Sequence, residues 1–260
     1  MDIYTLVALF FIYAVLGWFT EEVFALVKHG KIVNRGFLKG PLCPIYGFGM
    51  VIIILCLSPI KNWLPLLFIG SAVLTTLLEL VTGYVLEKFF HTKWWDYSDM
   101  HFNFRGYICL TFSILWGLAG VFIMDIVQPA VMDFIVKIPR KTGYIVLGAA
   151  LVILAIDLVT TIISMTDLCK SLAGLEALFE KAEDFLRKLE EERDERREER
   201  EEQLEQLRSR MEQLSEELHR RHRRFFDAFP HFERARFDRS GRMEKLKETL
   251  DKIKAEREKK

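Results

Sequence analysis

The chain has 260 residues, 51% of them hydrophobic, and its basic and acidic residues are equal in number, so the formal net charge is zero. The charge is unevenly placed: residues 166–260 hold 25 of the 36 Lys and Arg residues and 26 of the 36 Asp and Glu residues. Because both signs are mixed throughout this last third, the pattern indicates a solvated helix and excludes a basic nucleic-acid-binding arm.

Apolar runs fill the first two-thirds of the chain. Four of the five reach or exceed the roughly 20 residues that a helix needs to cross a bilayer. The second is shorter and bounded by Pro44 and Pro59, so we expect it to be tilted, extended into its flanks or partly re-entrant. The first run follows Met1 and Asp2 without a basic segment, and is therefore predicted to be a retained span and not a signal peptide. The runs are Ile3–Val27, Cys43–Leu57, Trp63–Leu86, Tyr107–Val127 and Tyr144–Met165.

These runs predict an all-α fold, a polytopic membrane helix bundle of about five transmembrane helices with a long charged cytoplasmic tail. Lys and Arg in short loops stay cytoplasmic. Basic residues cluster after the first and third runs, whereas Lys61 stands alone after the second. Three basic residues after the fourth run weaken the pattern. We expect a cell-membrane protein with its N-terminus outside and its tail inside. Cys43, Cys109 and Cys169 then lie toward the reducing side, which disfavours a disulfide framework.

Polar residues recur inside the apolar runs at spacings of three or four, so each set lines one helix face. Carboxyl groups at membrane depth are costly and usually face the bundle interior or a wet cavity. We expect those of Glu21, Glu79 and Asp157 to converge on one cytoplasm-facing pocket. Hydrogen bonding between helices is the simpler interpretation for Ser, Thr and Gly, and for Glu79 both interpretations stay open. The sets are Tyr13, Gly17 and Glu21; Ser71, Thr75, Glu79 and Gly83; and Asp157, Thr161 and Ser164.

Two loops are dense in unusual residues. Residues 34–47 are rich in Gly and Pro, and predict a turned segment that enters a helix near Pro44 and dips into the bundle, with a rigid tight turn as the alternative. Residues 91–106 hold an aromatic–acid–aromatic cluster, which interfacial anchoring of rings does not explain. We expect Asp96 to pair with Arg35 or Arg105. The candidate ligand-binding residues are Glu21, Arg35, Cys43, Tyr46, Glu79, Trp95, Asp96, Tyr97, Asn103, Arg105 and Asp157.

Familiar catalytic motifs are absent from the sequence. It has no G-x-x-x-x-G-K-[ST], so this chain is not itself an ATPase. It also has no G-x-S-x-G and no H-E-x-x-H. His91, His101 and the nearby Cys and Asp residues lack the spacing of a closed zinc site. No catalytic residue, metal or cofactor is therefore assigned.

The polar tail is predicted to form a long charged helix over residues 166–224, followed by a Phe-rich turn and a C-terminal amphipathic helix over 225–260. Apolar residues spaced three and four apart at 204–218 are typical of a coiled-coil seam. The last helix, Arg242–Ala255, would fold back on this seam or leave it free for homodimerisation. A lone solvated helix, or a surface resting on anionic lipid, are the alternatives.

Several motifs in order resemble the ABC-transporter type IV (CmpB-like) family of bacterial membrane proteins, across most of residues 3–165. They are the stretch GPLCPIYGFG, Glu79, the segment WWDYS and the run NFRGYICLTFSILWG; the phrase Phe229-Pro230-His231 resembles the family's C-terminus. His101 stands where relatives are expected to carry proline. The resemblance implies a transporter permease, with motif positions at Gly40, Pro41, Cys43, Pro44, Tyr46, Gly47, Glu79, Trp95, Asp96, Tyr97, Asn103, Gly106, Cys109 and Trp116.

Two functions stay open, and a third is weaker. A transport component would hold a small molecule or ion at the acidic residues and loops, and its tail would couple to a cytoplasmic partner such as an ATPase. A non-transporting scaffold or sensor would bind a lipid or small ligand and signal through the tail. The weaker hypothesis is a membrane enzyme acting on lipid headgroups. Five spans without an inverted repeat are few for a whole secondary transporter, which favours a homo-oligomer or a non-transport role. The expected partners are the lipid bilayer and a cytoplasmic protein, with no nucleic acid.

Overall fold

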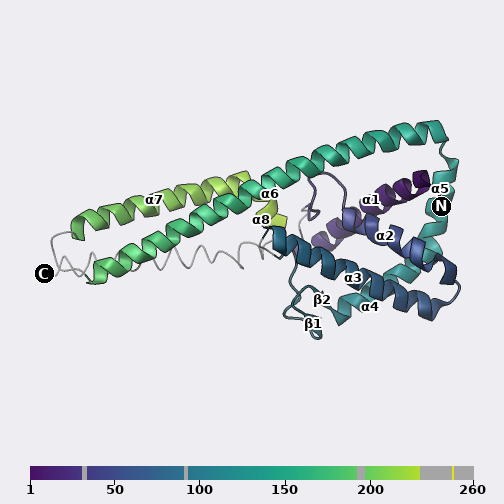
Figure 1. The fold of residues 1–260 in the computed structure, drawn as a ribbon, viewed down its shortest axis with the longest axis horizontal. Helices are drawn as coiled ribbons and strands as arrows, with labels where there is room; N and C mark the ends of the chain where they lie inside the picture. The colour runs from purple at the N-terminus through teal and green to yellow at the C-terminus, as the bar shows by residue number, and fades with distance from the viewer. Residues whose placement is uncertain (31–33, 91–92, 192–196, 229–247, 249–260) are drawn as a thin grey trace. The chain divides into compact units, whose positions relative to one another are not determined.

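The computed structural model describes residues 1–30, 34–90, 93–191, 197–228 and 248 of the chain (Figure 1). It divides into two compact units, Met1–Ile163 and Ser164–Lys260, and helix α6 begins in the first and ends in the second. The elements are α1 (Ile3–His29), α2 (Pro44–Leu57), the 3-10 turn η1 (Ser58–Ile60), α3 (Leu64–Phe90), β1 (Asn103–Phe104), β2 (Ile108–Cys109), α4 (Leu110–Phe122), the π-helical turn η2 (Ile123–Val127), α5 (Gln128–Lys137), α6 (Arg140–Glu191), α7 (Arg197–Arg221) and α8 (Arg223–Ala228).

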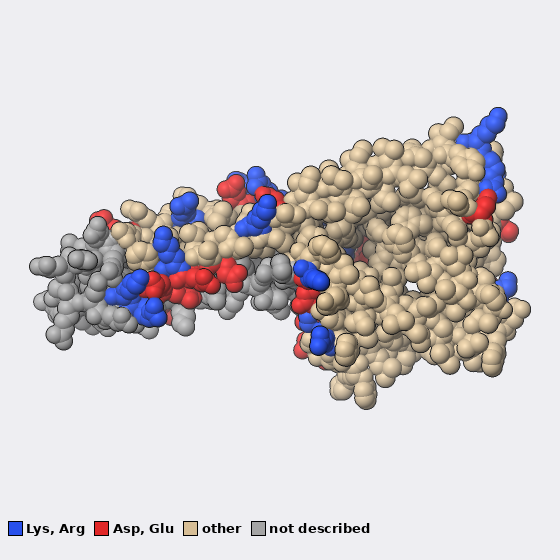
Figure 2. Space-filling view, viewed as in Figure 1, with Lys and Arg blue, Asp and Glu red and all other residues tan. Residues whose placement is uncertain are grey.

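The predicted all-α membrane bundle is confirmed. Within the described residues, four helical stretches are long and apolar enough to cross a membrane: Ile3–Val27, Leu64–Phe90, Leu110–Lys137 and the start of α6. The stretch Pro44–Ile60 is apolar but shorter. On the face of the first unit that Figure 2 shows, charged side chains gather toward the two ends, and the surface between them is uncharged except for acidic atoms in a recess. Such a band suits contact with lipid tails.

Small residues allow the helices of the first unit to approach closely. Helix α1 packs on α2, α2 on α3, and α3 on α4. A Cβ atom added to Gly17 would overlap the ring of Tyr46, and one added to Gly120 would overlap Ser71. Close approach of this kind is how helices associate in a membrane, where lipid removes the hydrophobic driving force.

The fourth helical stretch is longer than the sequence predicts. The apolar run ends at Val127, but the helix continues to Lys137 through Pro129. A proline inside a helix removes a hydrogen bond and crowds the carbonyl four residues before it. Here the π-helical turn η2 comes directly before α5, and its wider spacing accommodates the proline. The continuation buries Gln128, whose side-chain oxygen accepts a bond from the Tyr13 hydroxyl at 2.6 Å.

Helix α6 contacts the rest of the first unit through polar groups near its start and near Asp157, and Leu147 packs against the core between them. At its start, Arg140 pairs with Asp2 at 2.6 Å, and Gly143 lies against the Tyr4 hydroxyl. Further along, Asp157 contacts the loop before α2. Between these places, a Cβ atom at Gly148 would meet no described atom of the bundle within 4 Å. Much of the apolar surface of α6 is therefore left to lipid.

The second unit differs from the single long helix predicted over residues 166–224. Helix α6 ends at Glu191, and α7 runs alongside it in the opposite direction (Figure 1). Arg221 near the end of α7 reaches Asp167 of α6 at 3.2 Å. The reversal buries two apolar stripes that one extended helix would leave in water. The buried residues include Leu168, Leu172, Leu175 and Phe179 on α6, and Leu204, Met211 and Leu218 on α7. The predicted helix Arg242–Ala255 and the phrase Phe229–His231 lie outside the described residues.

Candidate functional site

The loop before α2 is held inside the first unit by hydrogen bonds to its backbone. Leu38 is fully buried, and the Cys43 backbone N–H donates to the Ala14 carbonyl of α1 at 2.9 Å. The Asp157 carboxylate of α6 accepts the backbone N–H groups of Lys39 at 3.0 Å and Gly40 at 2.8 Å. The loop thus packs against α1 and α6 and delivers Pro44 to the first turn of α2.

A first carboxyl–tyrosine pair forms where α1 meets α2. The Tyr46 hydroxyl donates to Glu21 Oε1 at 2.6 Å. Tyr46 lies in the first turn of α2, and its ring fills the space that Gly17 leaves open on α1. Thus residues that recur every fourth position on α1 face Tyr46, and Gly17 makes room for the ring whose hydroxyl binds Glu21.

A second pair forms where α3 meets the loop after it. The Tyr97 hydroxyl donates to Glu79 Oε1 at 2.9 Å, and the Tyr97 ring stacks on Phe112 of α4 with ring centroids 4.7 Å apart. Glu79 lies on the buried face of α3 with Ser71 and Gly83. A pair of similar chemistry therefore occurs at two helix junctions of one bundle.

The two pairs belong to one group, which we call the two-carboxyl cluster: Glu21, Tyr46, Glu79, Tyr97 and Trp116. Trp116 of α4 meets the Tyr46 ring edge-on at 5.7 Å and also lies near the Glu79 carboxylate. Glu21 interacts electrostatically with Glu79 and with Tyr97. The structure therefore brings together four residues that the sequence singles out separately.

Glu79 is the most deeply placed acid of this cluster. Only 8% of the residue is exposed, and its second carboxyl oxygen, Oε2, is buried without a well-formed hydrogen bond. Within the described part of the chain, neither Glu79 nor Glu21 forms an ion pair with Lys, Arg or His. A buried polar group normally has a partner, and an unpaired carboxylate at membrane depth is costly. The cluster thus holds two acids that have no basic partner among the described residues.

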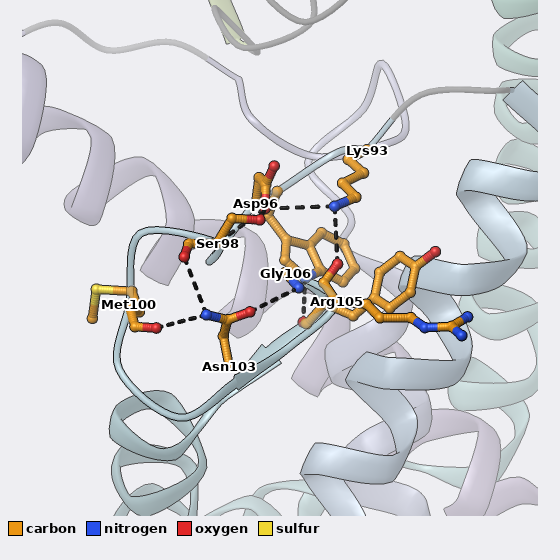
Figure 3. A network of polar contacts seen from close by, with 9 residues as sticks. Lys93, Asp96, Ser98, Met100, Asn103, Arg105 and Gly106 are labelled. Atoms are coloured by element: carbon orange, nitrogen blue, oxygen red, sulfur yellow. Dashed lines mark hydrogen bonds and ion pairs between the residues drawn. The ribbon is translucent and has the colours of Figure 1, made fainter.

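Other candidate residues form a separate network in the loop between α3 and α4 (Figure 3). Asp96 accepts bonds from Ser98 N at 3.0 Å and Ser98 Oγ at 2.5 Å, and Lys93 lies 3.7 Å from it. Asn103 donates to the carbonyls of Ser98 and Met100. The network closes a short hairpin of β1 and β2, paired antiparallel. These side chains shape the loop by bonding to its own backbone.

The expected pairing of Asp96 with an arginine is replaced by the contact with Lys93. The Arg35 guanidinium lies over the Phe24 ring at 5.5 Å, and that of Arg105 over the Phe104 ring at 5.8 Å. Arg105 has a positive φ of 52°, and its carbonyl accepts a bond from Lys93 Nζ at 2.9 Å. Lysine three residues before the aspartate reaches it locally, so no distant arginine is needed.

Trp95 links the loop network to the bundle. Its indole N–H donates to the Tyr107 carbonyl at 2.8 Å, and its ring lies close to Gly83 of α3. Gly83 is one turn after Glu79, so Trp95 and the two-carboxyl cluster lie at the same end of the first unit. Cys43 and Cys109, both buried, also lie near the cluster.

Two residues that matter at this site were not among the candidate ligand-binding residues. Trp116 is one ring in a continuous apolar run, and its only sequence signal is its position in the motif that resembles the family. Lys93 stands three residues before Asp96, a spacing that would suggest a pair only if the segment were known to turn. Both are placed by the fold around them.

The surroundings of Tyr97 and Asp96 shift their pKa values in opposite directions. The pKa of Tyr97 is raised because the phenol is buried and lies next to Glu79. For Asp96 burial acts upward, but the bonds from Ser98 and the charge of Lys93 outweigh it and lower the pKa. Tyr97 is thus held neutral as a donor, while Asp96 is held charged.

Among the residues described, no three His, Cys, Asp or Glu side chains come close enough together to hold a metal ion. Figure 2 shows a recess in the surface of the first unit, with acidic atoms visible at its floor.

A family model described as "Putative ABC-transporter type IV" matches residues 8–162. The matched range begins in α1 and ends in α6, so it includes the two-carboxyl cluster, the loop network and Asp157. It stops just before the second unit. No solved structure matches the chain.

Proposed function

Because the chain belongs to the ABC-transporter type IV (CmpB-like) family and carries membrane-spanning helices, we propose that it is a transport component of the cell membrane that binds a small solute at the two-carboxyl cluster. One observation carries the proposal: Glu79 is 8% exposed, with one carboxyl oxygen lacking a well-formed bond. Intramembrane acids that face a bundle interior usually mark a solute or ion path.

The proposed orientation places the N-terminus outside and the cluster toward the cytoplasm. The described loop residues 34–43 and 93–109 lie at the end of the bundle that holds the cluster, and they carry Arg35, Lys39, Lys93 and Arg105. Basic loops stay on the cytoplasmic side. The second unit follows the segment of α6 that contacts the first of these loops, so it would enter the cytoplasm and meet a protein partner such as an ATPase.

Native mass spectrometry of the full-length chain in detergent tests the proposal. We expect a co-purified small molecule on the wild-type protein, strongly reduced in Glu79→Gln, which keeps the side-chain shape but removes the charge. Asp133→Asn, an exposed acid on α5, is the matched control and should retain the molecule. Equal retention by Glu79→Gln and wild type would contradict a binding role for the cluster. The same spectra give the number of subunits.

A second candidate function is a sensor that relays ligand binding to the tail. It is favoured by one contact: Asp157, which holds the Lys39 and Gly40 backbone, lies on the same helix that continues into the second unit. Reconstituted vesicles separate the two functions. A transport component moves the co-purified molecule across the bilayer when its partner is present, whereas a sensor binds the molecule without moving it.

A further inference from the structure

Resting on the proposed function, the charge and the rings around the two-carboxyl cluster allow the class of solute to be named. We infer that the cluster binds a small organic ammonium ion, with its positive charge between Glu21 and Glu79 and its carbon groups against Trp116 and Tyr46.

The first argument is charge. Glu21 and Glu79 each accept one tyrosine bond, and neither has a basic partner among the residues that the structure describes. Three basic groups of the adjoining loops make contacts elsewhere: Lys93 with Asp96, Arg35 with the Phe24 ring and Arg105 with the Phe104 ring. Two acids without a counter-ion repel an anionic solute and attract a cation.

The second argument is the unfilled acceptor. Glu79 Oε2 is buried without a well-formed bond, although the carboxylate already receives the Tyr97 hydroxyl at its other oxygen. The Trp116 indole also approaches the carboxylate, but its contact does not make a well-formed bond to Oε2. An ammonium group would add a charge-assisted hydrogen bond at this oxygen.

The third argument separates an organic cation from a metal ion. In the described part of the structure, no three metal-ligating side chains gather at the site. Aromatic rings do gather: Trp116 against Tyr46, and Tyr97 against Phe112. A desolvated ammonium ion within about 6 Å of a ring face is stabilised by the ring quadrupole, most strongly on tryptophan. Rings and carboxylates together select a cation that has an apolar body.

Thermal unfolding of the full-length protein in detergent tests the inference. Methylammonium and tetramethylammonium chloride are titrated against sodium chloride at equal ionic strength. We expect a saturable rise in melting temperature with at least one ammonium ion and none with sodium. Glu79→Gln and Glu21→Gln should each raise the half-saturating ammonium concentration about tenfold or more. A tenfold rise corresponds to a loss of about 1.4 kcal/mol in binding free energy. Asp133→Asn should respond as wild type does.

Three outcomes of the titration would overturn the inference: no saturable response to either ammonium ion, an equal response to sodium, or an undiminished response in both glutamine variants. If Glu79→Gln fails to fold, Glu21→Gln makes the same comparison at a less buried acid. A neutral or anionic molecule that co-purifies with wild type and is lost in Glu79→Gln would refute the ammonium class and leave the proposed function standing. If the wild-type protein shows neither a saturable ammonium response nor a co-purified molecule that depends on Glu79, the ammonium class and the proposed function are both refuted.

Discussion

At the scale of single residues, the Tyr97 hydroxyl decides how well Glu79 is accommodated. Tyr97→Phe removes the donor at 2.9 Å and leaves a buried carboxyl group with no tyrosine bond. Leaving a buried acceptor unsatisfied costs about 1–3 kcal/mol of folding free energy. We therefore expect a lower melting temperature for Tyr97→Phe in detergent. Tyr84→Phe, at an exposed tyrosine of α3, is the control and should melt as wild type does.

The pH dependence of this loss follows from the raised pKa of Tyr97. The unfolded chain releases the phenol proton near pH 10, whereas the folded protein retains it. The unfolded state therefore binds fewer protons above that pH, and the stabilisation present below about pH 10 is lost as the pH rises past it. The difference in melting temperature between wild type and Tyr97→Phe should be smaller at about pH 11 than at about pH 8. An unchanged difference would contradict the raised pKa.

Gly106 offers a second test at this scale, because a matched glycine exists elsewhere. Gly106 and Gly30 both have positive φ, at 74° and 66°, so an alanine costs about 1 kcal/mol in backbone strain at either position. A Cβ atom at Gly106 would also overlap Asp96, whereas one at Gly30 meets nothing within 4 Å among the described residues. Gly106→Ala should destabilise the protein more than Gly30→Ala does. It should also increase the rate of proteolytic cleavage at Lys93 and Arg105. Equal melting temperatures for the two variants would show that the loop network carries little stability.

At the scale of helices, the contact between α3 and α4 depends on having no side chain at Gly120. A Cβ atom there would overlap Ser71, which is fully buried on α3. We expect Gly120→Ala to lower the melting temperature, since overpacking a well-packed interior costs about 1–3 kcal/mol. Gly148→Ala on α6 is the control: its Cβ meets no described atom within 4 Å, and alanine favours a helix by about 1 kcal/mol. Gly148→Ala should thus be neutral or stabilising.

Sequence patterns predicted those features that a membrane makes conspicuous. Glu21 and Glu79 stand out because each interrupts an apolar run, and helical spacing predicts the faces they share with Gly17 and Gly83. Their partners in the loop were harder to infer. Phe102 and Arg105 take positive φ, which no sequence signal marks, and only Gly106 indicates the turn. The pairing of Asp96 with Lys93 follows from that local geometry.

Two helix ends were missed for a similar reason. Val127 ends an apolar run, yet η2 lets the helix continue through Pro129, and the π-helical turn has no pattern of its own. The sequence did not predict the reversal between α6 and α7. Regularly spaced apolar residues indicate a packing surface, but they do not indicate which segment packs on it. Each helix has an apolar stripe that must be covered: Leu172 and Phe179 on α6, and Leu204 and Met211 on α7. The two stripes of the same chain cover each other.

At the scale of the whole molecule, successive helices are expected to cross the membrane in alternating directions. This alternation predicts which loops lie on the same side. The start of α1 and the start of α6 lie together, because Asp2 pairs with Arg140. The turn after α2 lies at that same end, since Leu57 and Ile135 belong to one core cluster with Tyr4. Lys61 and Lys137 are therefore expected on one side, outside the cell, and Asp99 and Lys188 on the other.

Cysteine labelling in whole cells measures this arrangement. Single cysteines at Lys61, Lys137, Asp99 and Lys188 are introduced after the four native cysteines are replaced by serine. All four positions are exposed, so reactivity reports the side of the membrane and not burial. A membrane-impermeant maleimide should label Lys61→Cys and Lys137→Cys in intact cells, and Asp99→Cys and Lys188→Cys only after permeabilisation. The reverse labelling pattern would show that the protein has the opposite orientation, with the two-carboxyl cluster toward the outside of the cell. Labelling of Lys61→Cys together with Asp99→Cys would mean that α3 does not cross the membrane, and the shared polar end of the bundle could not exist.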